Sequence, residues 1–363
     1  MNKQKALIAM SGGVDSSVAA YLMKQAGYDC IGVTMKLFDP VDAGVEREKS
    51  CCSLSDVEDA RSVAYRLGIP YYVFNFTADF HRQVLERFVC AYENGATPNP
   101  CIDCNRYLKF DSLYQRAQIL GCDRVATGHY ARIVQVGNRY VLKKALDASK
   151  DQSYVLYALT SSQLAHTAFP LGTLCKCETR QIAKEQGFYN ADKPDSQDIC
   201  FVPDGDYTAF IRRFTGKDYP AGDFTDAKGN VLGTHRGIIC YTVGQRRGLG
   251  IAAPQPLYVT RICPAENRVV LGSKEELLCA DFVVKDCNFT GFATVPTHFS
   301  ASVQVRYRGA EQEAQVTVLR DTTVRVHLCT PQSAVTVGQA AVFYDGDLLL
   351  GGGTIAAVGE EAI

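Results

Sequence analysis

The sequence predicts an α/β protein with a parallel sheet in its first half and a β-rich second half. Apolar runs alternate with helical spacing as far as about residue 130, an order typical of a parallel sheet. A glycine-rich turn joins the first apolar run to the first helical stretch. From about Asp206 the helical spacing gives way to short β-rich runs between glycines, which favours a barrel or sandwich.

The first half supplies the strands and helices of the expected sheet. The helical stretches lie at 15–27, 56–67 and 107–120, and the strands at 6–10, 30–35, 71–76 and 124–126. The carboxyl ends of parallel strands share one edge of a sheet. We therefore expect the glycine turn, Met35 and Gly128 on a single rim, where Gly128 would offer its backbone to a purine ring.

The second half supplies seven β-rich runs, at 237–243, 257–262, 268–271, 301–307, 314–318, 324–328 and 339–344. With the change of pattern at 206, they predict three domains, at 1–205, 206–277 and 278–363. We expect the first to be catalytic, the second to be a small connecting domain, and the third to be a β-barrel.

Composition restricts the class of protein. The chain has 363 residues, 47% of them hydrophobic and 21% charged, as in a globular protein with ample core. Its formal net charge of −1 means that any contact with nucleic acid must come from local basic patches. No stretch approaches about 18 apolar residues, and the first residues form a strand pattern instead of a leader. We therefore expect no membrane association and a cytoplasmic protein.

The glycine-rich turn reads Ala-Met-Ser-Gly-Gly-Val-Asp-Ser over residues 9–16. A strand, a tight turn and a helix N-terminus together direct backbone N–H groups and a helix dipole at an anion. Gly12 and Gly13 allow phosphate oxygens to approach the backbone, and Ser11 and Ser16 add hydroxyl donors. The spacing matches neither of the common nucleotide-binding glycine motifs. The plainer alternative is an ordinary turn between a strand and a helix.

Two cysteine segments carry the expected sulfur chemistry. Cys101 and Cys104 follow a proline-rich loop and precede a helix, whose dipole would lower the pKa of Cys104 with help from Arg106 and Lys109. Cys200 ends a second polar-to-apolar segment. The alternatives are core cysteines or half of a zinc site, although no partner pair has matching spacing.

The remaining cysteines predict less. Fifteen cysteines in a chain of this size favour small core residues over a disulfide framework. Cys51 and Cys52 lie in a polar, irregular stretch. Cys175 and Cys177 are too close in sequence to form half of a zinc site, and they flank Lys176 in a segment that resembles surface.

Six motifs occur in a fixed order. They are Ser-Gly-Gly-Val-Asp-Ser at 11–16, Asn-Pro-x-x-x-Cys-Asn at 99–105, Thr-Gly-His-Tyr at 127–130, Lys-Asp-Gln-Ser-Tyr at 150–154, Asp-Ser-x-x-Ile-Cys-Phe at 195–201, and Gly-Gln-Arg-Arg-Gly-Leu-Gly at 244–250. With them the whole chain resembles the tRNA-specific 2-thiouridylase family of the PP-loop ATP pyrophosphatases. The resemblance implies a Rossmann-like PP-loop domain (an adenine nucleotide alpha hydrolase), a small central linker domain and a C-terminal β-barrel that binds tRNA.

The resemblance also implies an activity. In that family, the wobble uridine of tRNA is adenylated with ATP and Mg²⁺ and its 2-oxygen is replaced by sulfur. Cys200 would carry a persulfide supplied by a sulfur-carrier protein or a cysteine desulfurase, and Cys104 would release the sulfur or form a Cys104–Cys200 disulfide. The implied nucleotide-binding residues are Ala9, Met10, Ser11, Gly12, Gly13, Val14, Asp15, Ser16, Met35 and Gly128. The implied tRNA-binding residues are Asn99, Pro100, Cys101, His129, Lys150, Asp151, Gln152, Arg306, Tyr307 and Gln339.

One position departs from the family pattern, which has Asp where this chain has Cys101. Two interpretations stay open. Cys101 is a spectator beside a persulfide relay, or Cys101, Cys104 and Cys200 ligate a [4Fe–4S] cluster that binds sulfide at an open iron.

Two other functions also fit parts of the pattern. PP-loops serve amide ligases that adenylate a small-molecule carboxylate or carbonyl, but such chemistry needs neither paired cysteines nor an RNA-binding barrel. A tRNA-binding module without catalysis is disfavoured by the intact glycine turn at 11–16.

Overall fold

The computed structural model describes residues 3–38, 54–195, 199–320 and 322–359. The chain forms two compact units. The first contains the residues up to Leu85, Pro100–Tyr207 and Asp347–Leu349, and the second contains Glu86–Asn99, Thr208–Gly346 and the residues from Leu350 onward. Cys51, Cys52 and positions 196–198 of the second cysteine motif lie outside the described residues. The domain boundaries at 205/206 and 277/278 stay a prediction.

The first unit is built on a parallel sheet of five strands in the order β3-β2-β1-β4-β7. The strands are β1 (Lys5–Ala9), β2 (Asp29–Lys36), β3 (Tyr71–Asn75), β4 (Arg124–Ala126) and β7 (Thr167–Ala168). The central strand β1 is paired on both sides, with Ala6 opposite Cys30 and Arg124. Ala6, Leu7 and Ile8 are fully buried, because helices cover both faces of such a sheet. The predicted α/β class is confirmed.

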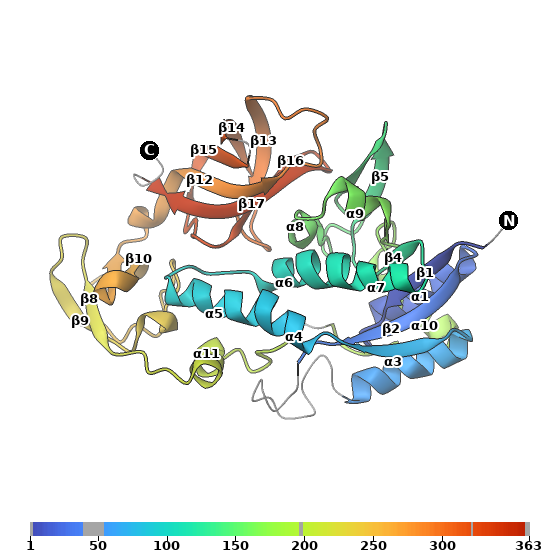
Figure 1. Ribbon diagram of the computed structural model, residues 1–363. Helices are drawn as coiled ribbons and strands as arrows, with labels where there is room; N and C mark the ends of the chain where they lie inside the picture. The colour runs from blue at the N-terminus through green and yellow to red at the C-terminus, as the bar shows by residue number, and fades with distance from the viewer. Residues whose placement is uncertain (1–2, 39–53, 196–198, 321, 360–363) are drawn as a thin grey trace. The chain divides into compact units, whose positions relative to one another are not determined.

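Helices of the first unit pack on this sheet. Val18 of α1, Val63 of α3 and Ala183 of α10 belong to one buried cluster with β1, β2 and β4 (Figure 1). The helices are α1 (Val14–Gln25), α3 (Leu54–Leu67), α4 (Thr77–Phe80), α6 (Pro100–Asp103), α7 (Leu113–Ile119), α8 (Ser153–Leu156), α9 (Ser161–Ala165) and α10 (Lys176–Glu185). Two π-helical stretches, η1 (His81–Leu85) and η2 (Cys104–Ser112), follow α4 and α6, and β5 (Arg132–Val136) and β6 (Arg139–Lys143) form a hairpin.

The second unit contains a four-stranded sheet in the order β10-β11-β8-β9. Its core gathers Phe224, Tyr241, Val259, Val269 and Leu271. The elements are α5 (Glu86–Glu93), α11 (Tyr207–Thr215), β8 (Gly222–Thr225), β9 (Val231–His235), β10 (Tyr258–Cys263), β11 (Arg268–Gly272) and the short 3₁₀ turns η3 (Ile238–Cys240), η4 (Pro264–Glu266) and η5 (Glu275–Leu277).

The predicted β run at 237–243 is wrong, because residues 238–240 form the 3₁₀ turn η3 instead. Gly237 precedes this turn with a φ of 103°, a backbone conformation that a strand does not contain. The apolar residue Ile239 is still fully buried. An apolar run of this length is therefore compatible with a buried turn as well as with a strand.

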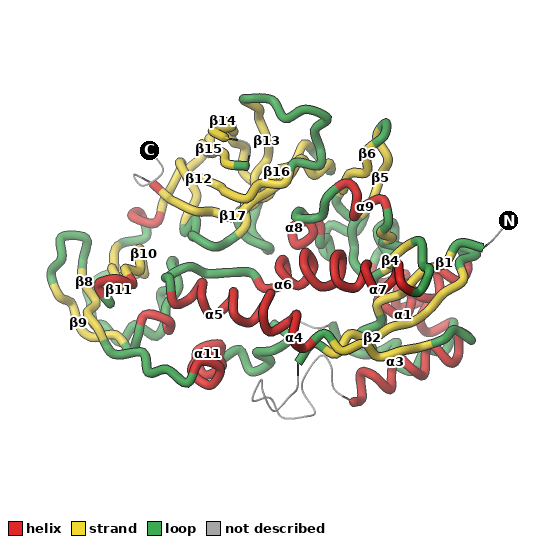
Figure 2. Tube along the Cα trace, viewed as in Figure 1, coloured by secondary structure: helices red, strands yellow, loops and turns green. Residues whose placement is uncertain are grey.

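A closed barrel of six strands completes the second unit. The strand order is β12-β15-β14-β13-β16-β17, and pairing between β12 and β17 closes it (Figure 2). Alternate residues such as Val303, Val316 and Val326 are buried, as expected for the inner face of a small barrel. The strands are β12 (Leu278–Asn288), β13 (His298–Gln304), β14 (Gln312–Arg320), β15 (Thr323–Ser333), β16 (Ala340–Asp345) and β17 (Leu348–Val358). The predicted C-terminal barrel is confirmed.

No helix in the described part of the chain is both long and apolar enough to cross a membrane.

Gly128 permits a close contact between the segment after β4 and the start of α1. A Cβ atom at this position would lie 2.7 Å from the backbone C of Asp15 and 2.7 Å from the backbone N of Ser16. We expect Gly128→Ala to destabilise the protein by roughly 1–3 kcal/mol, because backbone has to move to admit the methyl group. Urea unfolding measures the change.

Gly13→Ala is the control, since its added Cβ would lie 3.5 Å from Ser11 Oγ, an ordinary van der Waals contact. An equal loss of stability in the two variants would contradict the packing role of Gly128.

Candidate active site

The glycine turn lies between β1 and α1 and follows the predicted course. Gly12 has a φ of +76°, and Gly13 is the N-cap of α1 in an extended conformation. A Cβ on Gly12 would lie 2.4 Å from the backbone oxygen of Asp56, so only glycine fits this position. The first N–H groups of α1 lack acceptors within the helix, as in every α-helix, and are therefore suited to binding phosphate oxygens.

Serine hydroxyls and one buried amide hold the turn in shape. Ser16 Oγ donates to Gly13 O at 3.0 Å and accepts from Ser11 N at 3.1 Å, and Ser17 Oγ donates to Gly13 O at 3.0 Å. Asn190 lies far along the chain, yet its Nδ2 donates to Gly12 O at 2.8 Å and to Ser17 Oγ at 2.9 Å. The turn is therefore fixed from inside by its own serines and from behind by Asn190.

Asp15 is the acidic residue of the turn and is the centre of an ion-pair network. Lys176 Nζ lies 2.7 and 2.8 Å from the two Asp15 carboxylate oxygens, and Tyr130 Oη donates to Asp15 at 2.9 Å. Lys176 also pairs with Asp195 at 2.8 Å. Partial burial opposes ionisation of Asp195, but hydrogen bonds from Lys176 and Lys150 outweigh it and lower the pKa of this carboxyl to about 2.

Met35 and Gly128 lie at the carboxyl ends of β2 and β4, on the rim that the sequence predicts. Met35 is buried near the end of β2. Gly128 faces the backbone of Asp15 and Ser16, so its lack of a side chain serves the packing of α1. A contact between Gly128 and a purine stays a prediction.

His129, next to Gly128, is buried in an aromatic setting. Its ring lies near Phe110 and Phe169, and Nδ1 is 2.7 Å from Thr127 Oγ1. Burial, with a smaller contribution from Lys109, lowers the pKa of His129 well below its usual value. The ring is therefore neutral near pH 7, and its part in tRNA binding stays a prediction.

The surroundings of Cys104 differ from those that the sequence predicts. The helical run starts at Pro100, so Cys101 occupies the first turn, where the dipole acts, and Cys104 begins the next stretch. Cys104 is buried, and burial raises the pKa of its thiol although Lys109 acts in the opposite direction. The predicted lowering of the pKa is therefore wrong for this conformation.

Cys104 and Cys200 belong to segments that pack against the same helix. Phe201, next to Cys200, has its ring 5.8 Å from Phe80 of α4, and η2 also contacts α4. Cys101, Cys104 and Cys200 are not part of a disulfide, and Cys101 is exposed. A disulfide instead joins Cys175 and Cys177.

Cys101, Cys104 and Cys200 are also the predicted ligands of an iron–sulfur cluster. Within the described parts of the chain, no three His, Cys, Asp or Glu side chains are grouped to hold a metal ion. Cys101, Cys104 and Cys200 are all described, so in this arrangement they do not fit the three-thiolate site that a cluster would need.

The 150–152 motif has structural contacts in addition to its predicted tRNA role. Lys150 Nζ pairs with Asp195 at 2.9 Å. Asp151 accepts from the backbone of Ala145 at 2.7 Å, and burial raises the pKa of its carboxyl. Gln152 accepts from the backbone N of Tyr130 at 2.9 Å. Direct contacts of these residues with tRNA stay a prediction.

In the second unit, several predicted tRNA-binding residues meet at the loop 333–339. Arg306 is exposed and donates to the backbone oxygens of Ser333 at 2.6 Å and Ala334 at 2.8 Å. Gln339 donates to Thr97 O at 2.8 Å, two residues before Asn99. Tyr307 follows Arg306 and is 37% exposed. The barrel thus carries Arg306, Tyr307 and Gln339 around one loop.

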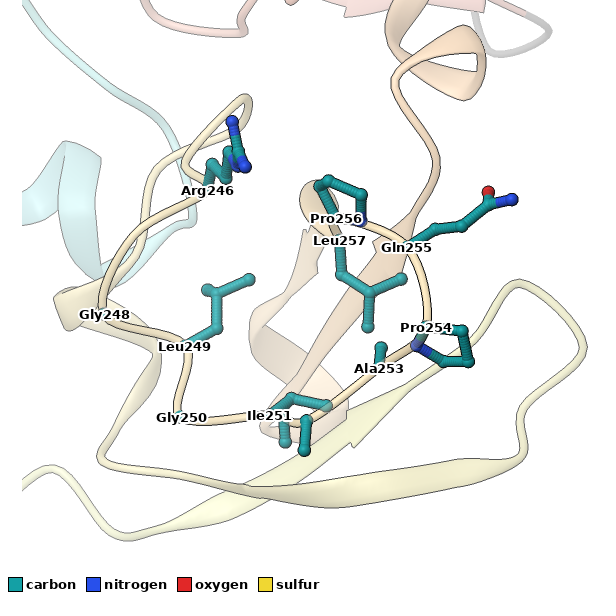
Figure 3. Close-up of a pocket in the computed structure, with 11 residues that line it drawn as sticks. Arg246, Gly248, Leu249, Gly250, Ile251, Ala253, Pro254, Gln255, Pro256 and Leu257 are labelled. Carbon is teal, nitrogen blue, oxygen red and sulfur yellow. The ribbon is translucent and has the colours of Figure 1, made fainter.

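A cavity of about 590 Å³ lies in the second unit, within the loop that contains the Gly-Gln-Arg-Arg-Gly-Leu-Gly motif. Figure 3 shows this loop curving around the hollow, with the side chains of Leu249 and Leu257 directed into it. The lining runs from Arg246 to Leu257 and includes no residue of the glycine turn and none of the reactive cysteines. We therefore place the candidate chemistry at the turn, not at this cavity.

A glycine turn at the first strand–helix junction of a parallel sheet, with thiols in the same unit, defines a PP-loop nucleotide-binding protein. The chain matches the tRNA methyl transferase HUP domain over residues 4–204, the tRNA methyl transferase PRC-barrel domain over 208–273 and the aminomethyltransferase β-barrel domain over 280–355.

Curated relatives are similar over almost the whole chain. A tRNA-specific 2-thiouridylase MnmA of Clostridium acetobutylicum is 51% identical over 98% of this chain and 100% of that protein. Proteins of the same description from Clostridioides difficile and Clostridium kluyveri are 49% and 48% identical, over 98% and 97% of this chain and 98% and 99% of theirs. The chain belongs to the tRNA-specific 2-thiouridylase family.

Sequence reasoning missed the residues that support the turn from a distance. Lys176 was expected in a surface segment, yet only 12% of its side chain is exposed. Asn190 is buried, and its Oδ1 has no hydrogen-bond partner among the described residues. Lys193 joins Asp56 and Asp59 of α3 at 2.6 Å each. The run of polar residues just before Asp195 was the only signal for Asn190 and Lys193.

Buried His129 predicts a stability that depends on pH. Below about pH 6.5 an unfolded histidine takes up a proton, whereas the folded His129, whose pKa is lowered, stays neutral. The unfolded state then binds more protons, so stability falls as pH decreases, by at most about 1.4 kcal/mol per pH unit from this group. We expect His129→Asn to reduce this slope in urea unfolding between pH 7.5 and 5.5.

The exposed His298 on the barrel provides the control variant, His298→Asn. An unchanged slope in His129→Asn would show that His129 accepts a proton in the folded state.

Proposed function

We propose that this protein thiolates the wobble uridine of tRNA at C2 in an ATP-dependent reaction. The observation that carries the proposal is the combination, in one unit, of a PP-loop and two cysteines outside any disulfide, on segments that pack against the same helix. Membership of the thiouridylase family gives this combination its substrate, a tRNA uridine.

In the first step, ATP activates the uridine. The C2 oxygen attacks the α-phosphate, AMP becomes attached to that oxygen, and pyrophosphate leaves. The N–H groups at the start of α1 and the hydroxyls of Ser11 and Ser16 bind the pyrophosphate. Mg²⁺ would supply charge neutralisation at the phosphates, and Asp15 is the carboxylate of the turn that would help to hold it.

In the second step, sulfur replaces the AMP-bearing oxygen. A persulfide on Cys200 presents its outer sulfur to C2, the C–S bond forms, and AMP leaves with the oxygen. The Cys104 thiolate then attacks Cys200 Sγ, which breaks the S–S bond to the product and leaves a Cys104–Cys200 disulfide. A dithiol reductant restores both thiols. Because burial raises the pKa of Cys104, this thiol is protonated until the second step exposes it.

The remaining assignments follow from the same proposal. A sulfur-carrier protein or cysteine desulfurase supplies the persulfide. The barrel and its loop 333–339 bind tRNA through Arg306, Tyr307 and Gln339, while Asn99, Pro100, Cys101, His129 and the 150–152 motif contact the RNA near the target base. The protein works in the cytoplasm with domains at 1–205, 206–277 and 278–363.

Two other activities are weaker candidates. An amide ligase of the PP-loop class would use neither the two thiols nor the barrel. Methyl transfer, which the descriptions of the matching domains mention, would not need ATP cleavage at a glycine turn. AMP and pyrophosphate release that requires tRNA separates thiolation from both.

The glycine turn is tested with Ser16→Ala. Because Ser16 Oγ both shapes the turn and offers a donor to phosphate, we expect tRNA-dependent AMP formation to be lost, by at least roughly tenfold. Turnover of labelled ATP is measured with and without tRNA. Ser161→Ala, which removes a hydroxyl near the β5–β6 hairpin of the same unit, is the control. Normal adenylation by Ser16→Ala would remove the turn from the active site.

The route of sulfur is tested with Cys101→Asp. In the persulfide relay, this variant restores the family pattern and thiolates as well as the wild type, whereas Cys200→Ser is inactive. If a [4Fe–4S] cluster were used, Cys101→Asp would lose iron and thiolation together. Both proteins are reconstituted anaerobically with iron and sulfide, and 2-thiouridine is measured by mass spectrometry with either sulfide or a persulfide donor. Iron binding by the wild type that Cys101→Asp abolishes would refute the relay.

A further inference from the structure

Lys176 is the first residue of α10, but its side chain contacts Asp15 in the first turn of α1. Its Nζ contacts both carboxylate oxygens of Asp15 at 2.7 and 2.8 Å, although the two residues are separated by 161 positions in the sequence. The Lys176 side chain is 12% exposed. Its ammonium group is therefore partly shielded from water. It lies beside the first turn of α1, the helix that follows the glycine turn.

The glycine turn contains no basic side chain of its own. Residues 11–16 contribute two hydroxyls and one carboxylate, and ATP is strongly anionic. A cation must therefore come from another segment to balance the β- and γ-phosphates. Among the described residues of this network, Lys176 is the cation in contact with the turn, since Lys150 and Arg180 pair with Asp195.

The two carboxylates that Lys176 contacts differ in their other partners. Asp195 retains Lys150 at 2.9 Å and Arg180 at 3.0 Å, and Asp15 retains the hydrogen bond from Tyr130. Lys176 is therefore the cation of this network that connects Asp195 to the turn, because it pairs with both Asp15 and Asp195.

We propose that Lys176 is the phosphate-contacting cation of the adenylation step, which binds the pyrophosphate part of ATP while Asp15 and Asp195 hold its position. The proposal deepens the function proposed above and rests on it for the reaction. Lys176 recognises the β- and γ-phosphates of ATP. AMP lacks these phosphates, so Lys176 does not contribute to the affinity for AMP.

The test compares Lys176→Met with Lys184→Met. Lys184 is on the same helix, and its ion pair with Asp192 is exposed, which makes it the matched control. Isothermal titration without tRNA measures the affinity for Mg²⁺–ATP and for AMP. We expect Lys176→Met to bind ATP roughly ten- to a hundredfold more weakly while its affinity for AMP is unchanged, and Lys184→Met to bind both as the wild type does.

Equal effects on ATP and AMP, or none, would overturn the proposal. Because these titrations need no tRNA, their outcome is separate from the Ser16→Ala turnover assay that tests thiolation.

If Lys176→Met does not fold, the proposal is tested on the wild-type protein by lysine acetylation. Lysines are acetylated with acetic anhydride in the presence of ATP, pyrophosphate or AMP, and each site is quantified by peptide mass spectrometry. ATP and pyrophosphate should protect Lys176 and AMP should not, while Lys184 reacts equally in all three. Equal acetylation of Lys176 with ATP and with AMP would refute the assignment.

Discussion

The carboxylate of Asp15 is the point on which the architecture of the first unit depends. Tyr130, which follows β4, and Lys176, which begins α10, both reach it, and Lys176 extends the contact to Asp195. Three segments that are far apart in sequence are thereby held against the first turn of α1. A change at Asp15 would therefore disturb the position of these segments as well as the turn itself.

Charged groups and buried, uncharged groups occupy different parts of this site. Charged groups lie around the glycine turn, where the low pKa of Asp195 keeps this carboxyl ionised over the whole physiological range. The neighbouring positions are buried and uncharged, as the neutral ring of His129 and the protonated thiol of Cys104 show. This division matches the proposed reaction, in which the charged end binds the phosphates of ATP and the buried end holds the thiol.

The features that could be predicted from the sequence are those that depend on residues close together in the chain. The parallel sheet, the barrel and the course of the glycine turn depend on local periodicity and on Gly12, whose conformation no other residue fits. Contacts across long separations could not be read in this way. Lys176 lies in a segment that resembles surface, and the sequence around Gln152 does not indicate that its side chain binds the backbone of Tyr130. The pKa of Cys104 was mispredicted because the depth of burial depends on tertiary packing.

The support that Asn190 gives to the turn also has a consequence for protein synthesis. Its amide binds Gly12 and Ser17 from 178 and 173 residues further along the chain. A ribosome adding about 5–20 residues per second needs roughly 10–35 seconds to make that interval. Throughout this time the emerging chain has its nucleotide loop but not the residues that fix it. A nascent chain therefore gains a complete ATP site only when nearly two hundred residues have been translated, long after the loop itself has left the ribosome.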